Sequence, residues 1–214
     1  MKKTISFLVL SSFVCLFFSC GKGGASNEVS VKLDASNYTD DGYFDGILYY
    51  TIISKSPNLI SVNKAEKNAV SVEIPTYVSI DGVGSDFKCT SISYGAFKGC
   101  SNIETITIPD CIESIGDEAF YGCNKLTSVV IGNGVKSIGK DVFYQCGSLN
   151  SITIGESLET IGNGAFNSTN IASITLPNSV KHIGDRAFYL CSNLESVTIP
   201  NGVISIGEDA FRRL

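Results

Sequence analysis

Apolar residues recur at a fixed step over the C-terminal half of the chain. The pattern Ile-Gly-x-x-Ala-Phe occurs in full at Ile115–Phe120 and again from Ile161, Ile183 and Ile206, and the copy from Ile138 differs only by Val142 in place of alanine. Its phenylalanines are 23 residues apart, with one step of 22, at Phe97, Phe120, Phe143, Phe166, Phe188 and Phe211. A register that is kept over this length indicates an internal repeat.

Each repeat also contains one short segment of alternating, β-branched residues. These segments are Ile106–Ile108, Val129–Ile131, Ile152–Ile154, Ile174–Leu176 and Val197–Ile199. Such segments predict short strands with one buried face. A proline or a glycine follows every segment and should end the strand.

A single coil of this length cannot bury its own apolar side, whereas stacked coils share one core. We therefore predict a repeat solenoid of the leucine-rich-repeat type over 92–214, lined by parallel strands, with the phenylalanines as its spine. Polar residues directly after Ile-Gly, such as Asp117, Asn163 and Asp185, are expected to start a short helical turn that carries Ala-Phe inward.

The combined pattern Leu-x-x-Ile-x-Ile-Pro-x-x-Val-x-x-Ile-Gly-x-x-Ala-Phe-x-x-Cys resembles the BspA-like leucine-rich repeat over about residues 68–214. The resemblance implies a strand-lined horseshoe without a fixed catalytic site. It also implies similarity to cell-surface and secreted bacterial proteins that bind host or bacterial partners.

The N-terminus has the pattern of an export signal over 1–19. Lys2 and Lys3 precede an apolar stretch that is too short to span a bilayer comfortably. A small residue before Cys20 resembles the lipobox of bacterial lipoproteins, in which the signal is cut before the cysteine and the cysteine is acylated. The alternative is an ordinary signal peptide with a chance cysteine. Small polar residues then predict a flexible tether over 20–36.

The two ends of the repeat region differ. Residues 37–91 are rich in aromatic and β-branched residues interrupted by turn signals, which predicts a β-hairpin N-terminal cap over the open edge of the first coil. The sequence stops inside a repeat, at Phe211–Leu214, without a comparable cap. Three explanations stay open: a truncated sequence, a natural end that frays, or an end covered by a partner or by self-association with a second copy.

Charge and residue types restrict the chemistry. The formal net charge of −5, without a basic stripe, argues against nucleic acid as a partner. No Ser/His/Asp or Cys/His constellation stands apart from the repeat, so we expect no enzyme activity and no cofactor. The only histidine, His182, is expected on the solvated surface.

Four of the eight cysteines share one repeat position, three residues after the phenylalanine. They are Cys100, Cys123, Cys146 and Cys191. Because no C-x-x-C pair is present, we expect a column of buried thiols and no metal site. Cys89 and Cys111 break the pattern and are candidates for a disulfide in an oxidising compartment.

Two exposed ladders are candidates for a binding surface. Outward strand positions carry hydroxyls, and a tyrosine follows several of the phenylalanines. The residues are Thr107, Thr153, Thr175 and Thr198 in the first ladder and Tyr121, Tyr144 and Tyr189 in the second. The hydroxyls either contact a protein or glycan or only suit a hydrated sheet. The tyrosines either stack on sugars or anchor an interface, or pack sideways on one another.

Together these features predict an envelope-anchored leucine-rich-repeat protein that acts as a macromolecular binding and adhesion module. The expected location is the outer membrane, held through a lipid on Cys20, with surface exposure left open. A glycan-binding envelope lipoprotein is the alternative. The ligand, protein or glycan, is not identified by the sequence.

Overall fold

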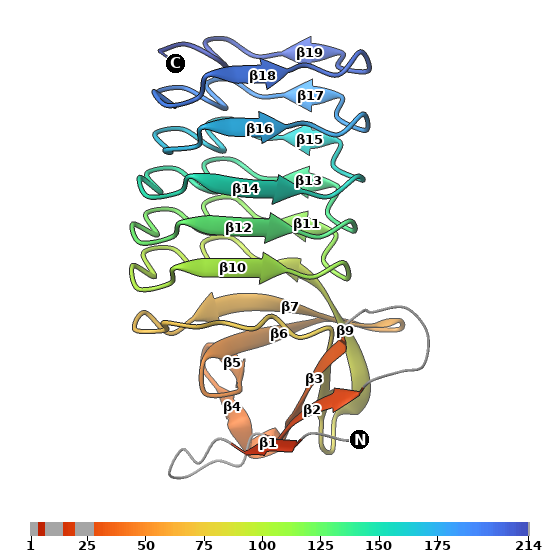
Figure 1. Cartoon of the computed structure of the whole chain (residues 1–214). Helices are drawn as coiled ribbons and strands as arrows, with labels where there is room; N and C mark the ends of the chain where they lie inside the picture. The colour runs from red at the N-terminus through yellow and green to blue at the C-terminus, as the bar shows by residue number, and fades with distance from the viewer. Residues whose placement is uncertain (1–3, 7–14, 20–27, 214) are drawn as a thin grey trace.

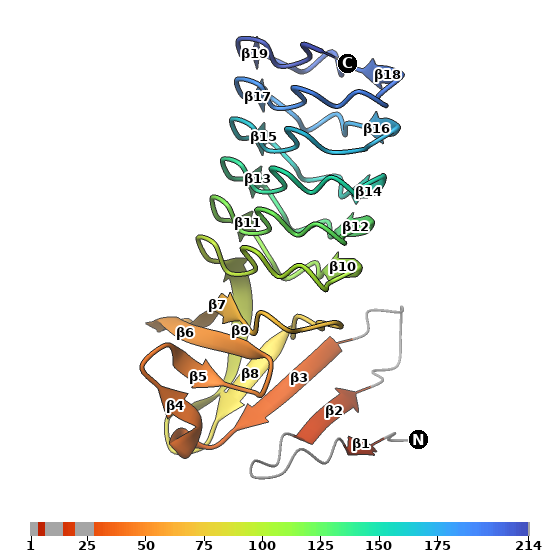
Figure 2. The ribbon, with the colours of Figure 1, turned by 90° about the vertical axis from the view of Figure 1, so that its left-hand side faces the viewer.

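The computed structural model describes residues 4–6, 15–19 and 28–213. Stacked coils form a column on top of a β-sheet cap (Figure 1). Each coil has two strands, which lie on opposite sides of the column (Figure 2). In the described part of the chain the 3₁₀ helix η1 (Ala35–Asn37) is the single helical element.

The longer strands occupy one side of the column. They are β10 (Thr105–Ile108), β12 (Ser128–Ile131), β14 (Ser151–Ile154), β16 (Ser173–Thr175) and β18 (Ser196–Thr198). Neighbouring strands are parallel and pair repeat against repeat, so that Ile106 lies beside Val129 and Val129 beside Ile152. The predicted strands are therefore confirmed, and their inward residues are buried in β10, β12 and β16 and half-buried in β14 and β18.

This row of strands is divided into a β10–β12–β14 sheet and a β16–β18 sheet. The division follows from the one short repeat. Leu149 lies three residues after Cys146, but Ile171 lies only two after Thr169 at the same repeat position. The shorter turn before β16 removes the regular ladder between β14 and β16.

The opposite side of the column is a ladder of two-residue strands that continues β9 (Gly84–Ile92). These strands are β11 (Ser114–Ile115), β13 (Ser137–Ile138), β15 (Thr160–Ile161), β17 (His182–Ile183) and β19 (Ser205–Ile206). Their isoleucines point into the core and are buried, except that Ile206 in the last described coil is 50% exposed.

The glycine after each of these isoleucines is required by the contact between coils. A Cβ on Gly139 would lie 2.7 Å from the backbone nitrogen of Asp117 and 2.9 Å from the carbonyl carbon of Gly116. A Cβ on Gly162 would lie 2.5 Å from the carbonyl carbon of Gly139. Backbone therefore stacks on backbone at this corner, and the room for a side chain is absent.

The expected short helical turn after Ile-Gly is wrong. Ala119 N donates to Gly116 O of its own coil at 3.3 Å, but Phe120 N donates to Val142 O of the next coil at 2.9 Å. Glu118 between them has a positive φ of 56°. Because alternate N–H groups bond to the next coil and a left-handed residue interrupts the turn, no helix can propagate.

Asp117 also has a different role from the one expected. Its Oδ1 accepts a hydrogen bond from the backbone nitrogen of Lys140, in the next coil, at 2.7 Å. Asp185 does the same for Glu208 at 2.8 Å. These side chains therefore tie neighbouring coils together instead of starting a helix.

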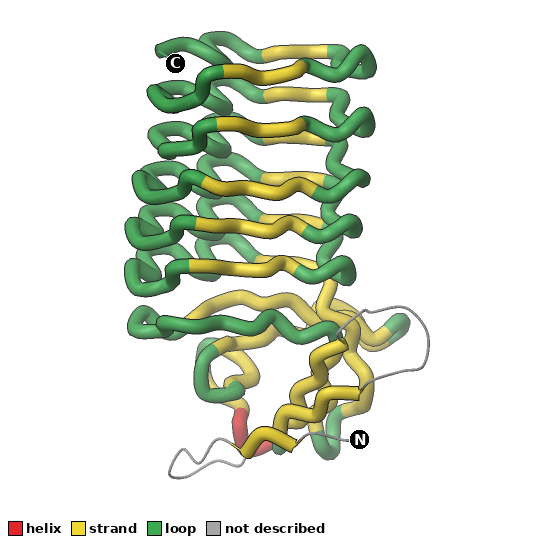
Figure 3. The backbone as a smooth tube through the Cα atoms, viewed as in Figure 1, coloured by secondary structure: helices red, strands yellow, loops and turns green. Residues whose placement is uncertain are grey.

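The column is nearly straight and not the horseshoe that the family resemblance implied (Figure 3). Both sides of each coil are strands, and parallel strands are spaced by about 4.8 Å wherever they pair. A solenoid curves when one side carries wider elements such as helices, about 10 Å across. Because the strands have the same spacing on both sides of this column, the difference in width that would cause curvature is absent.

The phenylalanine spine is present as predicted. Neighbouring rings are stacked nearly parallel, from 4.7 Å between the centroids of Phe97 and Phe120 to 5.4 Å between those of Phe143 and Phe166. Every ring from Phe97 to Phe188 is fully buried. Each ring therefore fills the space between the two strand ladders and contacts its neighbours above and below.

The cysteine column lies beside this spine. Cys146 Sγ donates to Phe120 O at 3.1 Å, and Cys123 and Cys191 contact the carbonyls of earlier phenylalanines in the same way. The six cysteines of the cap and the column are free thiols, so the structure contains no bond between Cys89 and Cys111. Within the described ranges, no group of three or more His, Cys, Asp or Glu residues could hold a metal ion.

The cap is a mixed β-sheet. Besides β9 it contains β3 (Glu28–Leu33), β4 (Tyr38–Thr39), β5 (Gly42–Phe44), β6 (Leu48–Lys55), β7 (Asn58–Ala65) and β8 (Tyr77–Ile80). β7 pairs in parallel with β9, which in turn pairs with β11 of the column. Ala65 N then donates to Ala96 O at 2.8 Å. β7 thus pairs with the first coil in the way that a preceding coil would. The cap in this way covers the open edge of the first coil.

The tether expected over 20–36 is wrong for its second half. β3 pairs in parallel with β8, and Val31 and Leu33 are buried in the cap core. The alternation of Val29, Val31 and Leu33 with polar residues makes this segment a half-buried strand. The rest of the tether, including Cys20, lies outside the described residues.

Within the predicted signal segment, β1 (Thr4–Ser6) pairs with β2 (Cys15–Ser19), and β2 pairs with β3, both antiparallel. Among the described residues, no helix has the length and apolar character needed to cross a membrane.

The stacked glycines generate a stability prediction. Gly139→Ala should destabilise the protein by about 1–3 kcal/mol, because the new methyl group forces two coils apart. Gly147→Ala is the matched control, since a Cβ there meets nothing within 4 Å and its effect should stay within about 0.5 kcal/mol. Urea unfolding followed by circular dichroism measures both, and equal stability of the two variants would contradict the close stacking.

The buried cysteines generate a reactivity prediction. Burial raises the pKa of the Cys100 and Cys111 thiols to about 11, so roughly one molecule in a thousand carries either thiolate at pH 8. Iodoacetamide should therefore leave the six buried cysteines of the cap and the column unmodified in the folded protein and modify them in urea. Site-resolved mass spectrometry measures this, with Ser192→Cys as an exposed control that should react at once. Rapid modification of Cys123 in the native protein would contradict the enclosed column.

Candidate functional site

The hydroxyl face is the outward side of the longer strands. It comprises Thr105, Thr107, Ser128, Val130, Ser151, Thr153, Ser173, Thr175, Ser196 and Thr198. All of these side chains are exposed except that of Ser128, which is half-buried. Parallel pairing places Thr107, Val130 and Thr153 in one row and Thr175 beside Thr198 in another. The threonines predicted as a ladder therefore share one side of the column.

This face is polar but uncharged. A threonine hydroxyl both donates and accepts hydrogen bonds. In the described part of the chain, the hydroxyls of Thr107, Thr153, Thr175 and Thr198 make no hydrogen bond to protein atoms, so each is available to a ligand. Val130, 41% exposed, adds a single apolar contact within the same row. A flat surface of this kind can bind an extended partner but has no group that would activate a nucleophile.

The tyrosines lie on the turn segments that join the two strand ladders, away from the hydroxyl face (Figure 2). Tyr121 and Tyr144 are stacked, with ring centroids 5.1 Å apart and planes at 20°. Lys98 Nζ lies 4.7 Å from the centroid of the Tyr121 ring and is paired with Glu118. The sideways packing considered for these tyrosines is thus present for this pair.

Tyr189 does not continue the stack. Asn167 occupies the equivalent position in the coil between Tyr144 and Tyr189. The Arg213 guanidinium lies 5.7 Å from the Tyr189 ring centroid. The two predicted ladders therefore become the hydroxyl face, the Tyr121–Tyr144 stack and a separate Tyr189.

The structure adds a depression that the sequence analysis did not identify. A cavity of about 450 Å³ lies beside Tyr144, with Gly164 and Asn167 in its wall. The signal was present in the sequence, because Gly164 and Asn167 are smaller than the residues at the same positions in neighbouring coils. Both residues depart from the repeat pattern, so the positions that the repeats share do not reveal them.

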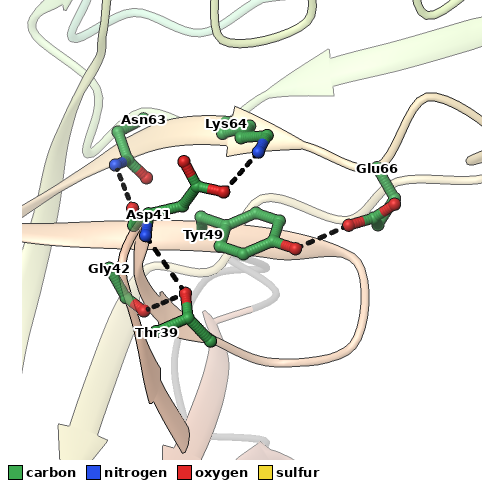
Figure 4. A network of polar contacts seen from close by, with 7 residues as sticks. All are labelled: Thr39, Asp41, Gly42, Tyr49, Asn63, Lys64 and Glu66. Atoms are coloured by element: carbon green, nitrogen blue, oxygen red, sulfur yellow. Dashed lines mark hydrogen bonds and ion pairs between the residues drawn. The ribbon is translucent and has the colours of Figure 1, made fainter.

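A polar network in the cap attaches the β4–β5 hairpin to β7 (Figure 4). Asn63 Nδ2 donates to Asp41 O at 2.6 Å, and Lys64 pairs with the Asp41 carboxylate. Tyr49 OH donates to Glu66 Oε1 at 2.6 Å, and this hydrogen bond, with some burial, raises the pKa of Tyr49 to about 12. A tyrosine that holds its proton this firmly is a structural donor and a poor acid catalyst.

The cap also encloses a carboxylate. Asp45 Oδ1 accepts from the backbone nitrogens of Ile47 and Leu48 at 2.8 and 2.7 Å, and the Tyr50 hydroxyl donates to its other oxygen. Burial raises the pKa of Asp45, and that of the fully buried Tyr50 is raised as well. Both groups are committed to internal bonds, so they fix the turn before β6 and are not open to a substrate.

Comparisons with known proteins agree with the repeat architecture. The model of the BspA-type leucine-rich-repeat region matches residues 90–214 in six copies. No functionally curated protein matches the chain.

Solved structures of bacterial leucine-rich-repeat proteins are similar in fold. A T. pallidum protein is 29% identical, with a TM-score of 0.66 over 74% of this chain and 72% of its own. A Bacteroides ovatus protein is 32% identical, with a TM-score of 0.70 over 78% of this chain and 43% of its own. A leucine-rich cell surface protein of Faecalibacterium prausnitzii is 25% identical, with a TM-score of 0.59 over 82% of this chain and 52% of its own. The chain thus spans about half or less of the latter two proteins.

The stacked phenylalanines, the glycines that follow the isoleucines of the short strands, and the six matched repeats lead to one assignment. The chain belongs to the BspA-type leucine-rich-repeat family.

Proposed function

We propose that this protein is an envelope-anchored binding and adhesion module that holds a macromolecular partner, foremost a protein, on the hydroxyl face. The observation that carries the proposal is the exposure of that face. Hydroxyls repeat from coil to coil on parallel strands and are not used by the fold itself. A rigid, preorganised surface loses little entropy when a partner binds to it.

The composition of the face favours a macromolecule over an ion. The strand positions carry no charge, so neither a phosphate nor a metal ion has a counter-charge there. An extended partner laid across the strands can instead form a hydrogen bond with each coil in turn. Many weak contacts in one direction add up to useful affinity in the way that repeated modules do.

The anchor is proposed on Cys20. The lipobox-like sequence before this cysteine supports acylation, and several acyl chains hold a protein stably at a membrane. The similarity to the F. prausnitzii protein, which is described as a cell surface protein, supports an envelope location. Residues 21–27 separate Cys20 from β3. At their full extension of roughly 25 Å they would keep the cap close to the lipid headgroups.

Glycan binding is the second candidate. It is supported by the stacked Tyr121 and Tyr144 rings, since an aromatic face with a polar edge suits the apolar faces and hydroxyls of a sugar. The two candidates use different sides of the column, so variants can separate them.

The hydroxyl-face proposal predicts a specific loss of binding. Thr153→Arg combined with Thr175→Arg should reduce binding to the protein's partners at least tenfold, because two long charged side chains block the centre of the face. The measurement is surface plasmon resonance against immobilised extracellular-matrix proteins and bacterial surface extracts. Asn124→Arg, in an exposed turn, is the matched control and should bind as the wild type does. Equal binding by both variants would rule out this face.

The anchor predicts a change of location. Cys20→Ser should abolish the incorporation of labelled palmitate and move the protein from the membrane fraction to the soluble fraction, because the acylated thiol is lost. Cys15→Ser, inside the signal segment, should leave both unchanged. Membrane association that persists in Cys20→Ser would show that another part of the protein holds it there.

A further inference from the structure

The stack of tyrosines is interrupted at one coil. Tyr121 covers one face of the Tyr144 ring, at 5.1 Å between centroids. The next coil carries Asn167 at this position, and among the described residues no aromatic ring lies against the other face of Tyr144. The cavity of about 450 Å³ lies here. One ring is therefore missing from a row whose neighbouring coils supply it.

A second small residue enlarges the gap. Gly164 stands where the neighbouring coils carry Asp141 and Arg186. It has a positive φ of 62°, and a Cβ there would collide with the Asp141 carboxylate, which leans over it. Gly164 and Asn167 belong to one coil, and both line a single depression. We call this depression the notch.

The walls of the notch are polar and planar. Asn167 is only 8% exposed, and its Oδ1 accepts from Ser168 Oγ at 2.8 Å. Its amide nitrogen donates to no group in the described part of the chain, and the residue lines the cavity. Asp141 and Arg186 stand on either side, one coil before and one coil after. Amide, carboxylate and guanidinium groups can each pair with two adjacent hydroxyls.

The spacing between coils leaves room for a saturated six-membered ring such as that of a pyranose. Coils follow one another at about 4.8 Å, so the coils on either side of the notch are roughly 9.6 Å apart. A ring stacked on Tyr144 would occupy one step of the row, as the Tyr121 ring does. A pyranose offers such a ring, with an apolar face for the tyrosine and hydroxyls at its rim for the planar polar groups.

The charge of the notch favours a neutral ligand. Three acidic residues and two basic residues line it. They are Asp141, Asp185, Glu208, Lys140 and Arg186. An anionic sugar or a nucleotide would meet an excess of carboxylates, and a nucleic acid would also meet a chain with an isoelectric point near 4.9.

From these observations we infer that the notch binds one neutral pyranose unit of a polysaccharide, stacked on Tyr144 and hydrogen-bonded to Asn167, Asp141 and Arg186. The inference rests on the glycan candidate above and gives it a defined site. That site is separate from the hydroxyl face, so a protein and a polysaccharide can be bound at the same time.

The test uses the full chain and a panel of neutral polysaccharides, namely dextran, mannan, galactan and xylan, with hyaluronate and heparin as acidic comparisons. Isothermal titration calorimetry should detect binding to at least one neutral member, with competition by its free monosaccharide. Asn167→Tyr, which supplies the missing ring, and Tyr144→Ala, which removes the platform, should each lower the affinity at least tenfold. Tyr94→Ala, which removes an exposed tyrosine away from the notch, should change it less than twofold.

The outcomes separate the two proposals. Binding that survives Asn167→Tyr, binding to the acidic polymers alone, or no binding to any member of the panel would overturn the notch assignment. Thr153→Arg with Thr175→Arg should leave polysaccharide binding unchanged, and Asn167→Tyr should leave protein binding unchanged. If the melting curve of each variant matches that of the wild type, the changes in binding are local. If Asn167→Tyr melts at a lower temperature than the wild type, Tyr144→Ala is the decisive variant.

Discussion

Hydrogen bonding between the backbones of successive coils is the interaction on which the rest of this structure depends. It operates on both strand ladders and also on the turns, where Phe120 N donates to Val142 O of the next coil. One common spacing follows on every side of the column. That spacing makes the column straight, brings the phenylalanine rings into stacking distance and leaves the Ile-Gly corner no room for a Cβ.

The same constraint explains why the cap is built as it is. An open ladder presents unpaired N–H and C=O groups along its whole edge. In the cap, β7 covers this edge. It pairs with β9 and continues past it, so that Ala65 N donates a hydrogen bond to Ala96 O. A strand of the cap thus takes the place of a preceding coil, and the first phenylalanine, Phe97, is buried as fully as those inside the stack.

Features that differ from the repeat are the best candidates for recognition by a specific ligand. Residues shared by all coils, such as the glycine of Ile-Gly or the buried cysteines, are explained by contacts inside the column. Gly164, Asn167 and the shortened turn before β16 depart from the repeat pattern, and all three fall within the same repeat. They open the notch on one side of the column and divide the strand row on the other.

The sequence by itself determined the repeat, its strands, the phenylalanine spine and the buried thiols, because each of these follows from apolar residues that recur at a fixed interval. The tertiary structure decided what depends on contacts between residues that are distant in the sequence. It showed that Asp117 bonds to Lys140 instead of starting a helix, and that β3 belongs to the cap. It also placed the predicted threonines and tyrosines on different sides of the column. Periodicity fixes which residues face inward, but the side on which an outward residue lies, and the gap left by a smaller neighbour, follow only from the path of the whole coil.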